Sequence, residues 1–212
     1  MKPLLVFLLF SLSSISFAQS EYQYYENLRL ERQKNNIKSI SHFEGDNNNP
    51  YEIEYFSVDG NPSKFESYTS EYKLYILVEI TNISKNGLVS YTQTNNLSSS
   101  SPLQFSSENI KISELYDIGF GDNTITDVKY IFDSKYFLIE KKYFAEDFDL
   151  NIPLTNEKYF YNNEGKLNMS KLFDSDNSLT STAYYFYNSQ GLAEKITHKD
   201  SNSYTIIKYE FY

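Results

Sequence analysis

The sequence of 212 residues contains no cysteine, no tryptophan and only two histidines, His42 and His198. Without a thiol, the chain can form no disulfide, no cysteine-ligated zinc or iron–sulfur site and no cysteine nucleophile. Two histidines are too few for a multi-histidine metal centre. No catalytic constellation stands out in the sequence either, so we expect a protein that is not an enzyme and that uses no cofactor and no metal.

Positive charge is also scarce. The chain has 19 lysines and arginines against 28 aspartates and glutamates, which gives a formal net charge of −9. A nucleic-acid-binding face requires clustered positive charge, and so does electrostatic attachment to an anionic membrane. We therefore expect no nucleic-acid partner, whereas the acidic balance permits cationic partners without requiring them.

A compact apolar run occurs at the start of the chain. Lys2 is followed by uninterrupted apolar residues at 4–10, and the small residues Ser16 and Ala18 precede Gln19. This arrangement predicts a signal peptide, 1–18, that is cleaved before Gln19. A membrane anchor is the alternative, but the run is shorter than the ~20 residues that span a bilayer. The remaining chain, 19–212, is thus expected to be secreted or periplasmic, with no membrane span.

The chain is rich in aromatic residues, with 21 tyrosines and 16 phenylalanines. Such side chains fit the pleated, half-buried surface of a β-sheet. Apolar residues alternate with others along 72–80 and again along 51–55, which is the two-residue period of a strand. The spacing of a helix is seen only near the mature N-terminus, at Tyr22, Tyr25 and Leu28.

The most informative feature is a repeat. Three stretches place a glycine four residues after a group of aromatics or near-aromatics, and they lie at 54–60, 159–167 and 185–192. Gly165 and Gly191 are 26 residues apart. Further copies lack the glycine: 135–144 aligns without a gap on 164–173, and 38–42 matches 194–198. Each copy is interpreted as a β-hairpin whose turn needs a residue with positive φ, which glycine supplies without strain.

Six hairpins and a half-copy at 209–212 give about a dozen strands, and open sheets of more than ~10 strands tend to curl, split or close. We predict one all-β domain over 19–212, an antiparallel meander of repeated β-hairpins that forms a curled sheet or a barrel-like structure. A two-sheet sandwich is the alternative. The period breaks at about 102–127, which holds a degenerate copy or an irregular insertion. The last strand is expected to pair within the sheet or to accept a partner strand.

The best copies, at 159–173 and 185–198, resemble the YD repeats of RHS-type shell proteins and the related MORN-variant repeats of small secreted bacterial proteins. The resemblance covers roughly 24–101 and 128–212. It implies hairpin units that stack into an extended, curling antiparallel sheet. The arginines usual in these repeats are missing here, and Asn162 and Asn188 stand where the family has aspartate.

Two acidic segments are candidates for chemistry. Glu146, Asp147 and Asp149 could supply the paired carboxylates of a glycan hydrolase if two of them faced each other. A solvated loop is the simpler interpretation. The segment 174–178 begins like a calcium-binding loop, but Leu179 replaces the glycine that such a loop requires. A hairpin connection explains the segment.

His42 and His198 occupy equivalent positions of the repeat. They could share a metal ion if the sheet closed on itself, or they could be polar residues at the ends of strands. Tyr159, Tyr161, Tyr185 and Tyr187 are the candidate ligand-binding residues, because rows of flat aromatic rings can stack on sugars or dock a peptide if they are exposed.

Three functions remain open at this point. The first is a secreted, non-catalytic repeat protein that binds a protein or glycan partner at the cell envelope through its sheet. The second is a carrier of a small ligand in an aromatic-lined β-barrel cavity. The third is a carboxylate-dependent glycan hydrolase. An exposed aromatic row favours the first, and an internal cavity favours the second.

Overall fold

A computed structural model describes residues 21–84, 88–95, 103–111, 125–145, 153–199, 201 and 203–212. Within these residues, thirteen strands form one antiparallel sheet in the order β6-β5-β4-β3-β2-β1-β13-β12-β11-β10-β9-β8-β7. The strands are β1 Ile37–Glu44, β2 Glu52–Phe56, β3 Pro62–Tyr68, β4 Leu74–Ile83, β5 Leu88–Asn95, β6 Leu103–Lys111, β7 Ile125–Phe132, β8 Leu138–Ala145, β9 Thr155–Tyr161, β10 Leu167–Asp174, β11 Leu179–Tyr187, β12 Ala193–His198 and β13 Tyr204–Phe211.

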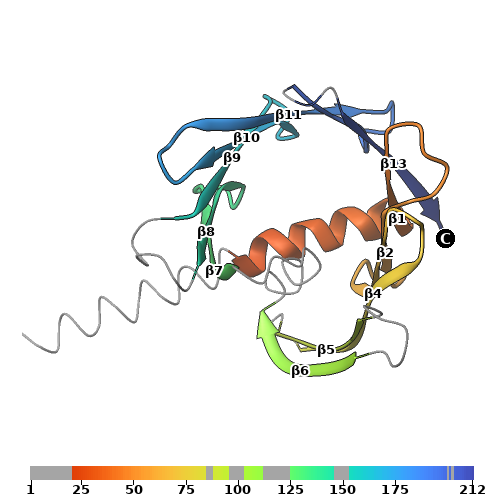
Figure 1. Ribbon diagram of the computed structural model, residues 1–212. Coiled ribbons are helices and arrows are strands. Elements are labelled where there is room, and N and C mark those ends of the chain that lie inside the picture. Colours follow the sequence, from red (N-terminus) through yellow and green to blue (C-terminus); the bar gives the residue numbers. More distant parts are fainter. Residues whose placement is uncertain are drawn as a thin grey trace, which may run out of the picture.

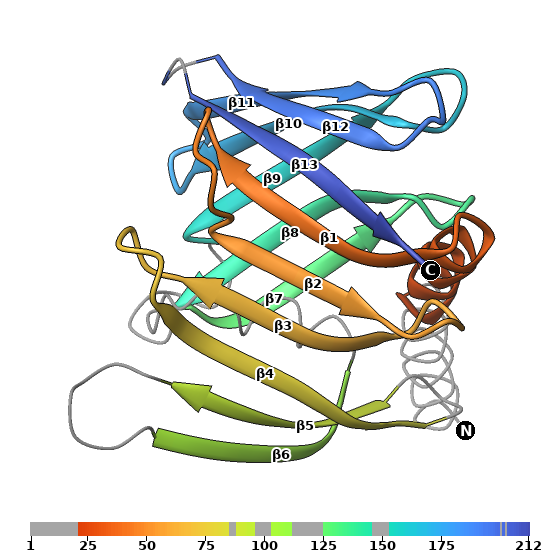
Figure 2. The ribbon, with the colours of Figure 1, turned by 90° about the vertical axis from the view of Figure 1, so that its right-hand side faces the viewer.

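The sheet consists of two meanders joined by their first and last strands. The first strand, β1, pairs with the last strand, β13, at the centre of the sheet. On one side of this pair, β2 to β6 follow in chain order to one edge, and on the other side β12 to β7 follow in reverse chain order to the other edge. The C-terminal strand therefore pairs within the sheet and is not one of its edges. Figures 1 and 2 show the sheet curling until its two ends approach each other, but β6 and β7 remain edge strands in the described structure.

The predicted curled, antiparallel all-β meander is confirmed, and the sandwich alternative is wrong because all thirteen strands belong to one sheet. Within the irregular stretch at about 102–127, residues 103–111 form β6 and β7 begins at Ile125. The predicted signal peptide, 1–18, lies outside the described residues. In the part of the chain that the structure covers, no helix is long and apolar enough to cross a membrane.

One tight turn recurs between the strands. In the β9–β10 turn, the N–H of Asn162 donates to the carbonyl of Lys166 and the N–H of Gly165 donates to the carbonyl of Asn162. The turns at 57–61, 69–73, 133–137, 174–178 and 188–192 repeat both hydrogen bonds. The fourth residue of each turn has positive φ, as in a three-residue hairpin loop that ends in a bulge. The predicted positive φ is confirmed at Gly60, Gly165 and Gly191, with values of 77°, 78° and 82°.

The first residue of the turn stabilises it with its side chain. Oδ1 of Asn162 accepts hydrogen bonds from the backbone N–H groups of Glu164 and Lys166, at 2.9 and 3.0 Å. Asn188, Asp133 and Asp174 do the same in their own turns. Such a local bond holds the turn even where the fourth residue is not glycine, as at Tyr136 and Asn177.

A helix that includes residues 21–34 crosses one end of the curl, as Figure 1 shows in orange. The spacing of Tyr22, Tyr25 and Leu28 indicated helical periodicity here, but the predicted all-β domain contained no helix. The helix contacts both meanders. Arg29 donates to the carbonyl of Asp59 at 2.7 Å, the ring of Tyr24 lies 5.5 Å from that of Phe132 of β7 in a tilted arrangement, and Glu21 lies 4.0 Å from Lys111 of β6.

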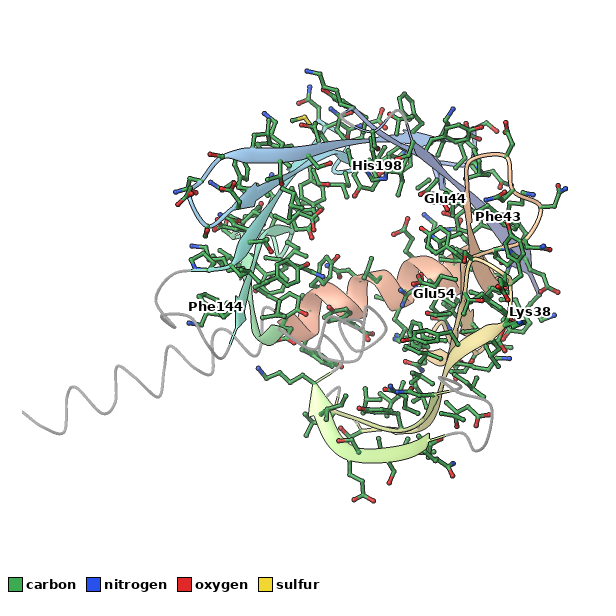
Figure 3. All side chains as sticks on the ribbon, in the orientation of Figure 1. Lys38, Phe43, Glu44, Glu54, Phe144 and His198 are labelled. Carbon is green, nitrogen blue, oxygen red and sulfur yellow. The ribbon has the colours of Figure 1, made fainter. Side chains whose placement is uncertain are left out.

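Alternation along the strands gives the sheet an inner and an outer face. Glu54 and His198 lie on the inner side in Figure 3, whereas Lys38, Phe43 and Phe144 lie on the outer side. Apolar packing is concentrated in two groups. One surrounds Ile76, Val78 and Val89 in the N-terminal meander. The other joins Ile37, Phe56 and Leu192 near the helix.

Candidate functional site

A pocket lies between the helix and the inner face of the sheet, at the end of the curl that carries the turns at 133–137, 162–166 and 188–192. Its volume is about 360 Å³. Six aromatic residues line it: Tyr24 from the helix and Tyr136, Phe137, Tyr161, Tyr187 and Tyr209 from the C-terminal meander. The recurrence of the hairpin brings these rings together, because each copy places an aromatic residue just before or inside its turn.

Aliphatic and charged side chains complete the pocket. The aliphatic ones are Leu28, Ile37, Ile40, Leu167 and Leu192, and the charged ones are Glu31, Arg32 and Lys166. Arg32 stacks on the ring of Phe56, with Cζ 4.3 Å from the ring centre. The wall is therefore mostly apolar, with a few charged groups that could orient a bound molecule.

Three of the pocket tyrosines make the same structural contact. The hydroxyl groups of Tyr161, Tyr187 and Tyr209 donate to the backbone carbonyls of Leu138, Leu167 and Ala193, at 2.8, 2.7 and 2.8 Å. Each bond joins the end of one strand to the beginning of the preceding strand. The phenol oxygens keep lone pairs, so they can still accept a hydrogen bond from a ligand.

The environment of these tyrosines keeps them protonated. Burial, together with the charges of Tyr185 and Glu31, raises the pKa of Tyr187 to about 12. Burial is also the main cause of the raised pKa values of Tyr161 and Tyr209. The pocket thus presents neutral phenols over the whole physiological pH range.

The structure places all four predicted tyrosines on the inner face. Tyr161 and Tyr187 line the pocket. Tyr159 and Tyr185 lie two residues farther along the same strands, outside it. The Tyr159 hydroxyl donates to the Glu157 carboxylate at 2.6 Å, and burial raises the pKa of Tyr159. The Tyr185 hydroxyl lies 3.4 Å from Oγ of Ser170.

The other sequence candidates have different outcomes. Glu146, Asp147 and Asp149 lie outside the described residues, so the hydrolase hypothesis stays a prediction. In the calcium-loop candidate, Oδ1 of Asp174 accepts hydrogen bonds from the N–H groups of Asp176 and Ser178, as in the other repeated turns. This carboxylate oxygen stabilises a hairpin.

The two histidines are not brought together. They lie on β1 and β12, which are separated by β13. His42 is opposite Ile207 of that strand, whereas the His198 N–H donates to the carbonyl of Ser203. Ile207 and Ser203 lie four residues apart in the chain, and β13 itself separates the two strands that carry the histidines. The two imidazoles are therefore too far apart to share a metal ion in this arrangement.

His42 instead lies beside two glutamates that the sequence analysis did not select. Its Nε2 is 3.2 Å from Oε1 of Glu54 and 3.9 Å from Oε1 of Glu52. Burial would lower the pKa of His42, but the hydrogen bond and charge of Glu54 outweigh it and raise the pKa. The pKa of Glu52 is raised to about 7, mainly because the carboxyl is buried. The charge of Glu54 also raises this pKa, whereas the charge of His42 lowers it.

A sequence signal for this cluster exists. Glu52 and Glu54 alternate with Tyr51, Ile53 and Tyr55, so both carboxylates share one face of a strand. What the sequence did not provide is the register that sets Glu52 opposite His42, or the fact that this acidic face points inward.

Comparison with known proteins identifies no family. No protein-family model matches the chain, and no curated protein sequence matches it. The resemblance to YD and MORN-variant repeats therefore rests on the residues of the repeat itself.

Proposed function

We propose that this protein binds a small amphipathic ligand in the tyrosine-lined pocket between the helix and the sheet. The observation that carries the proposal is the pocket itself, a space of about 360 Å³ lined by six aromatic residues. Ligand sites in proteins are typically concave, mostly apolar spaces of about 300–1,000 Å³ with a few polar groups. The sheet is curled rather than closed, and the helix supplies one wall of the pocket.

The lining suggests the chemistry of the ligand. Flat rings of Tyr161, Tyr187 and Tyr209 favour a planar, apolar body, and their phenol oxygens can accept hydrogen bonds from it. Glu31, Arg32 and Lys166 lie on the same pocket wall. A planar molecule with one or two polar substituents fits these groups best.

The proposal includes the setting of the protein. The apolar run and small residues before Gln19 support export, and the Tyr-Asn-x-x-Gly hairpins support a kinship with the β-hairpin repeats of secreted bacterial proteins. We therefore place the binding function outside the cytoplasm, in the periplasm or the medium.

The proposal can be tested with aminoanthracene, a neutral planar fluorophore, as the probe. Titration of the purified chain should show saturable fluorescence enhancement with about one site per molecule. Ala193 lines the pocket, and Ala193→Met fills part of its volume. This substitution should weaken probe binding by about tenfold.

Ser189→Met is the matched control, since Ser189 is an exposed residue of the neighbouring β11–β12 turn. It should leave the affinity unchanged. Non-saturable binding, or equal affinity for wild type and Ala193→Met, would refute a ligand site in this pocket.

The outer face supports a second candidate function, the binding of an acidic glycan at the cell envelope. Phe160 of β9 is exposed by 40%, and Tyr184 and Phe186 of β11 are exposed by 37% and 49%, with β10 between the two strands. Lys158 of β9 and Lys171 of β10 stand directly opposite each other in the register of these two strands. Flat rings can stack on sugars. The carboxylates of an acidic glycan would offset the repulsion between the two opposed lysines.

This second candidate predicts salt-sensitive retention of the chain on immobilised polygalacturonate. Phe186→Ala should reduce retention. Phe211→Ala, at an exposed aromatic residue of β13, should not. Equal retention of the two variants would argue against glycan binding by this face.

A further inference from the structure

The inner face carries a second group of functional side chains, separate from the pocket. His42 of β1 stands opposite Glu52 of β2 in the register of the two strands, and Glu54 follows on the same face. One nitrogen of the histidine and one oxygen of each glutamate all lie within 4.8 Å of one another. All three side chains are largely buried, with exposed fractions of 17%, 16% and 14%.

One imidazole cannot balance the charges of Glu52 and Glu54 when both carboxylates are ionised. In the described part of the chain, the ion pairs of Glu52 and Glu54 are both made with His42. Even a protonated imidazole leaves one negative charge in excess when both carboxylates are ionised. Buried charges are costly unless they are paired or coordinate a metal, so the group favours a bound cation.

We propose that His42, Glu52 and Glu54 bind a divalent transition-metal ion, with zinc as the first candidate. Zinc bonds of about 2.0–2.2 Å to nitrogen and oxygen place neighbouring tetrahedral ligands about 3.3–3.6 Å apart. The 3.2 Å between Nε2 of His42 and Oε1 of Glu54 already matches this spacing. Oε1 of Glu52, at 3.9 Å from Nε2, needs only a small movement.

The donor set selects among metals. An imidazole nitrogen suits zinc, cobalt and nickel, whereas calcium and magnesium prefer oxygen ligands throughout. Three protein ligands leave a fourth position open for water or another molecule, which is the arrangement of non-structural zinc sites. The inferred site therefore leaves one coordination position of the ion open to a further ligand.

The site adjoins the pocket along the sheet. Ile40 and Tyr209 line the pocket and stand opposite each other in β1 and β13, and Glu54 is opposite Ile40 in the next strand. The metal proposal is independent of the small-ligand proposal, because its ligands are other residues and its test uses metal alone.

The test begins with the full chain freed of metal by a chelator and titrated with Zn²⁺ by calorimetry. We expect about one equivalent to bind and the melting temperature to rise, because binding to the native state stabilises it. Co²⁺ should give visible absorption without thiolate charge-transfer bands, since the chain has no cysteine. Glu54→Gln and His42→Asn should each weaken binding by about tenfold or more.

Two controls use matched residues. His198→Asn removes the other histidine and should not change binding. Glu66→Gln alters an outer-face carboxylate whose exposed fraction, 14%, equals that of Glu54, and it should also leave binding unchanged. Failure of Zn²⁺ to bind at all, or an equal loss in His198→Asn, would overturn the proposal.

A measurement on the unmodified chain covers the case in which His42→Asn does not fold. Paramagnetic Co²⁺ should shift or broaden the imidazole resonances of His42 and spare those of His198. Equal effects on the two histidines, or none on His42, would show that the His42–Glu54 contact is only an ion pair between two strands.

Discussion

The hydroxyl of Tyr187 donates a 2.7 Å hydrogen bond to the backbone carbonyl of Leu167, at the start of the preceding strand. Tyr161 and Tyr209 make equivalent bonds to Leu138 and Ala193. The repeated tyrosine thus has two roles. Its hydroxyl ties one strand to the next, and its ring forms the wall of the pocket. The repetition that builds the sheet also builds the candidate ligand site.

The first prediction concerns this bond. Tyr187→Phe keeps the ring but leaves the Leu167 carbonyl without its phenol donor, and should lower the free energy of unfolding by about 1–2 kcal/mol. Tyr184→Phe is the control, because Tyr184 is an exposed outer-face tyrosine on the same strand. It should change stability by less than about 0.5 kcal/mol. Urea denaturation followed by circular dichroism measures both, and equal effects would contradict the structural role.

The second prediction concerns the turn. Asn162→Ala removes the acceptor of two backbone hydrogen bonds and should cost about 1 kcal/mol in unfolding free energy. Asn163 is exposed in the same turn, and Asn163→Ala should be nearly neutral. If the two substitutions had the same effect in thermal denaturation, the asparagine of the repeat would have no special part in the turn.

The third prediction concerns contact between the helix and the sheet. A Cβ atom at Gly60, where φ is +77°, would lie 2.2 Å from the backbone oxygen of Arg29. Gly60→Ala should therefore destabilise the chain by at least about 2 kcal/mol. Gly45 has a φ of +57° and open space around it, so Gly45→Ala should cost only about 1 kcal/mol. Similar melting temperatures for the two variants would argue against helix packing on this turn.

The hairpins were predictable because their signal is local. A turn asparagine and a glycine with positive φ lie within four residues, as at Asn162 and Gly165, and their geometry does not depend on the rest of the fold. Turns that use Tyr72, Tyr136 or Asn177 at the positive-φ position escaped the glycine pattern. There the side chain of the first residue, such as Asp133, supplies the stabilising hydrogen bonds.

The sites were less predictable because they depend on distant pairing. The helix spacing at Tyr22, Tyr25 and Leu28 indicated a helix but not that it would cross the end of the curl. The pairing of β1 with β13 and β2 sets His42 among its neighbours, and no local pattern fixes that register. The inward orientation of Glu52 and Glu54 also reverses the usual expectation that the apolar face of a strand is the buried one.

The fourth prediction uses the pKa of Glu52, raised to about 7 from 4.5, with burial as its main cause. Below about pH 4.5 the carboxyl is protonated in both states, and above pH 7 the folded state must hold a costly carboxylate. Its neighbours His42, Glu54 and Tyr51 contain one imidazole and no other cation. Stability should thus fall as pH rises from 4.5 through 7.

Glu52→Gln removes this penalty. In chelator-treated protein it should raise the free energy of unfolding by about 1–3 kcal/mol at pH 8 and change it little at pH 4.5. Denaturant titrations at the two pH values measure the difference. The same change at both would mean that Glu52 ionises normally in the folded chain.

The central claim is that the inner, helix-covered face is the ligand-binding face of this protein. The most direct measurement is the affinity of aminoanthracene for two variants side by side, Ala193→Met in the pocket and Phe186→Ala on the outer face. Our account predicts that Ala193→Met weakens the affinity by about tenfold and that Phe186→Ala leaves it at the wild-type value. The reverse result, loss in Phe186→Ala with full binding by Ala193→Met, would contradict it.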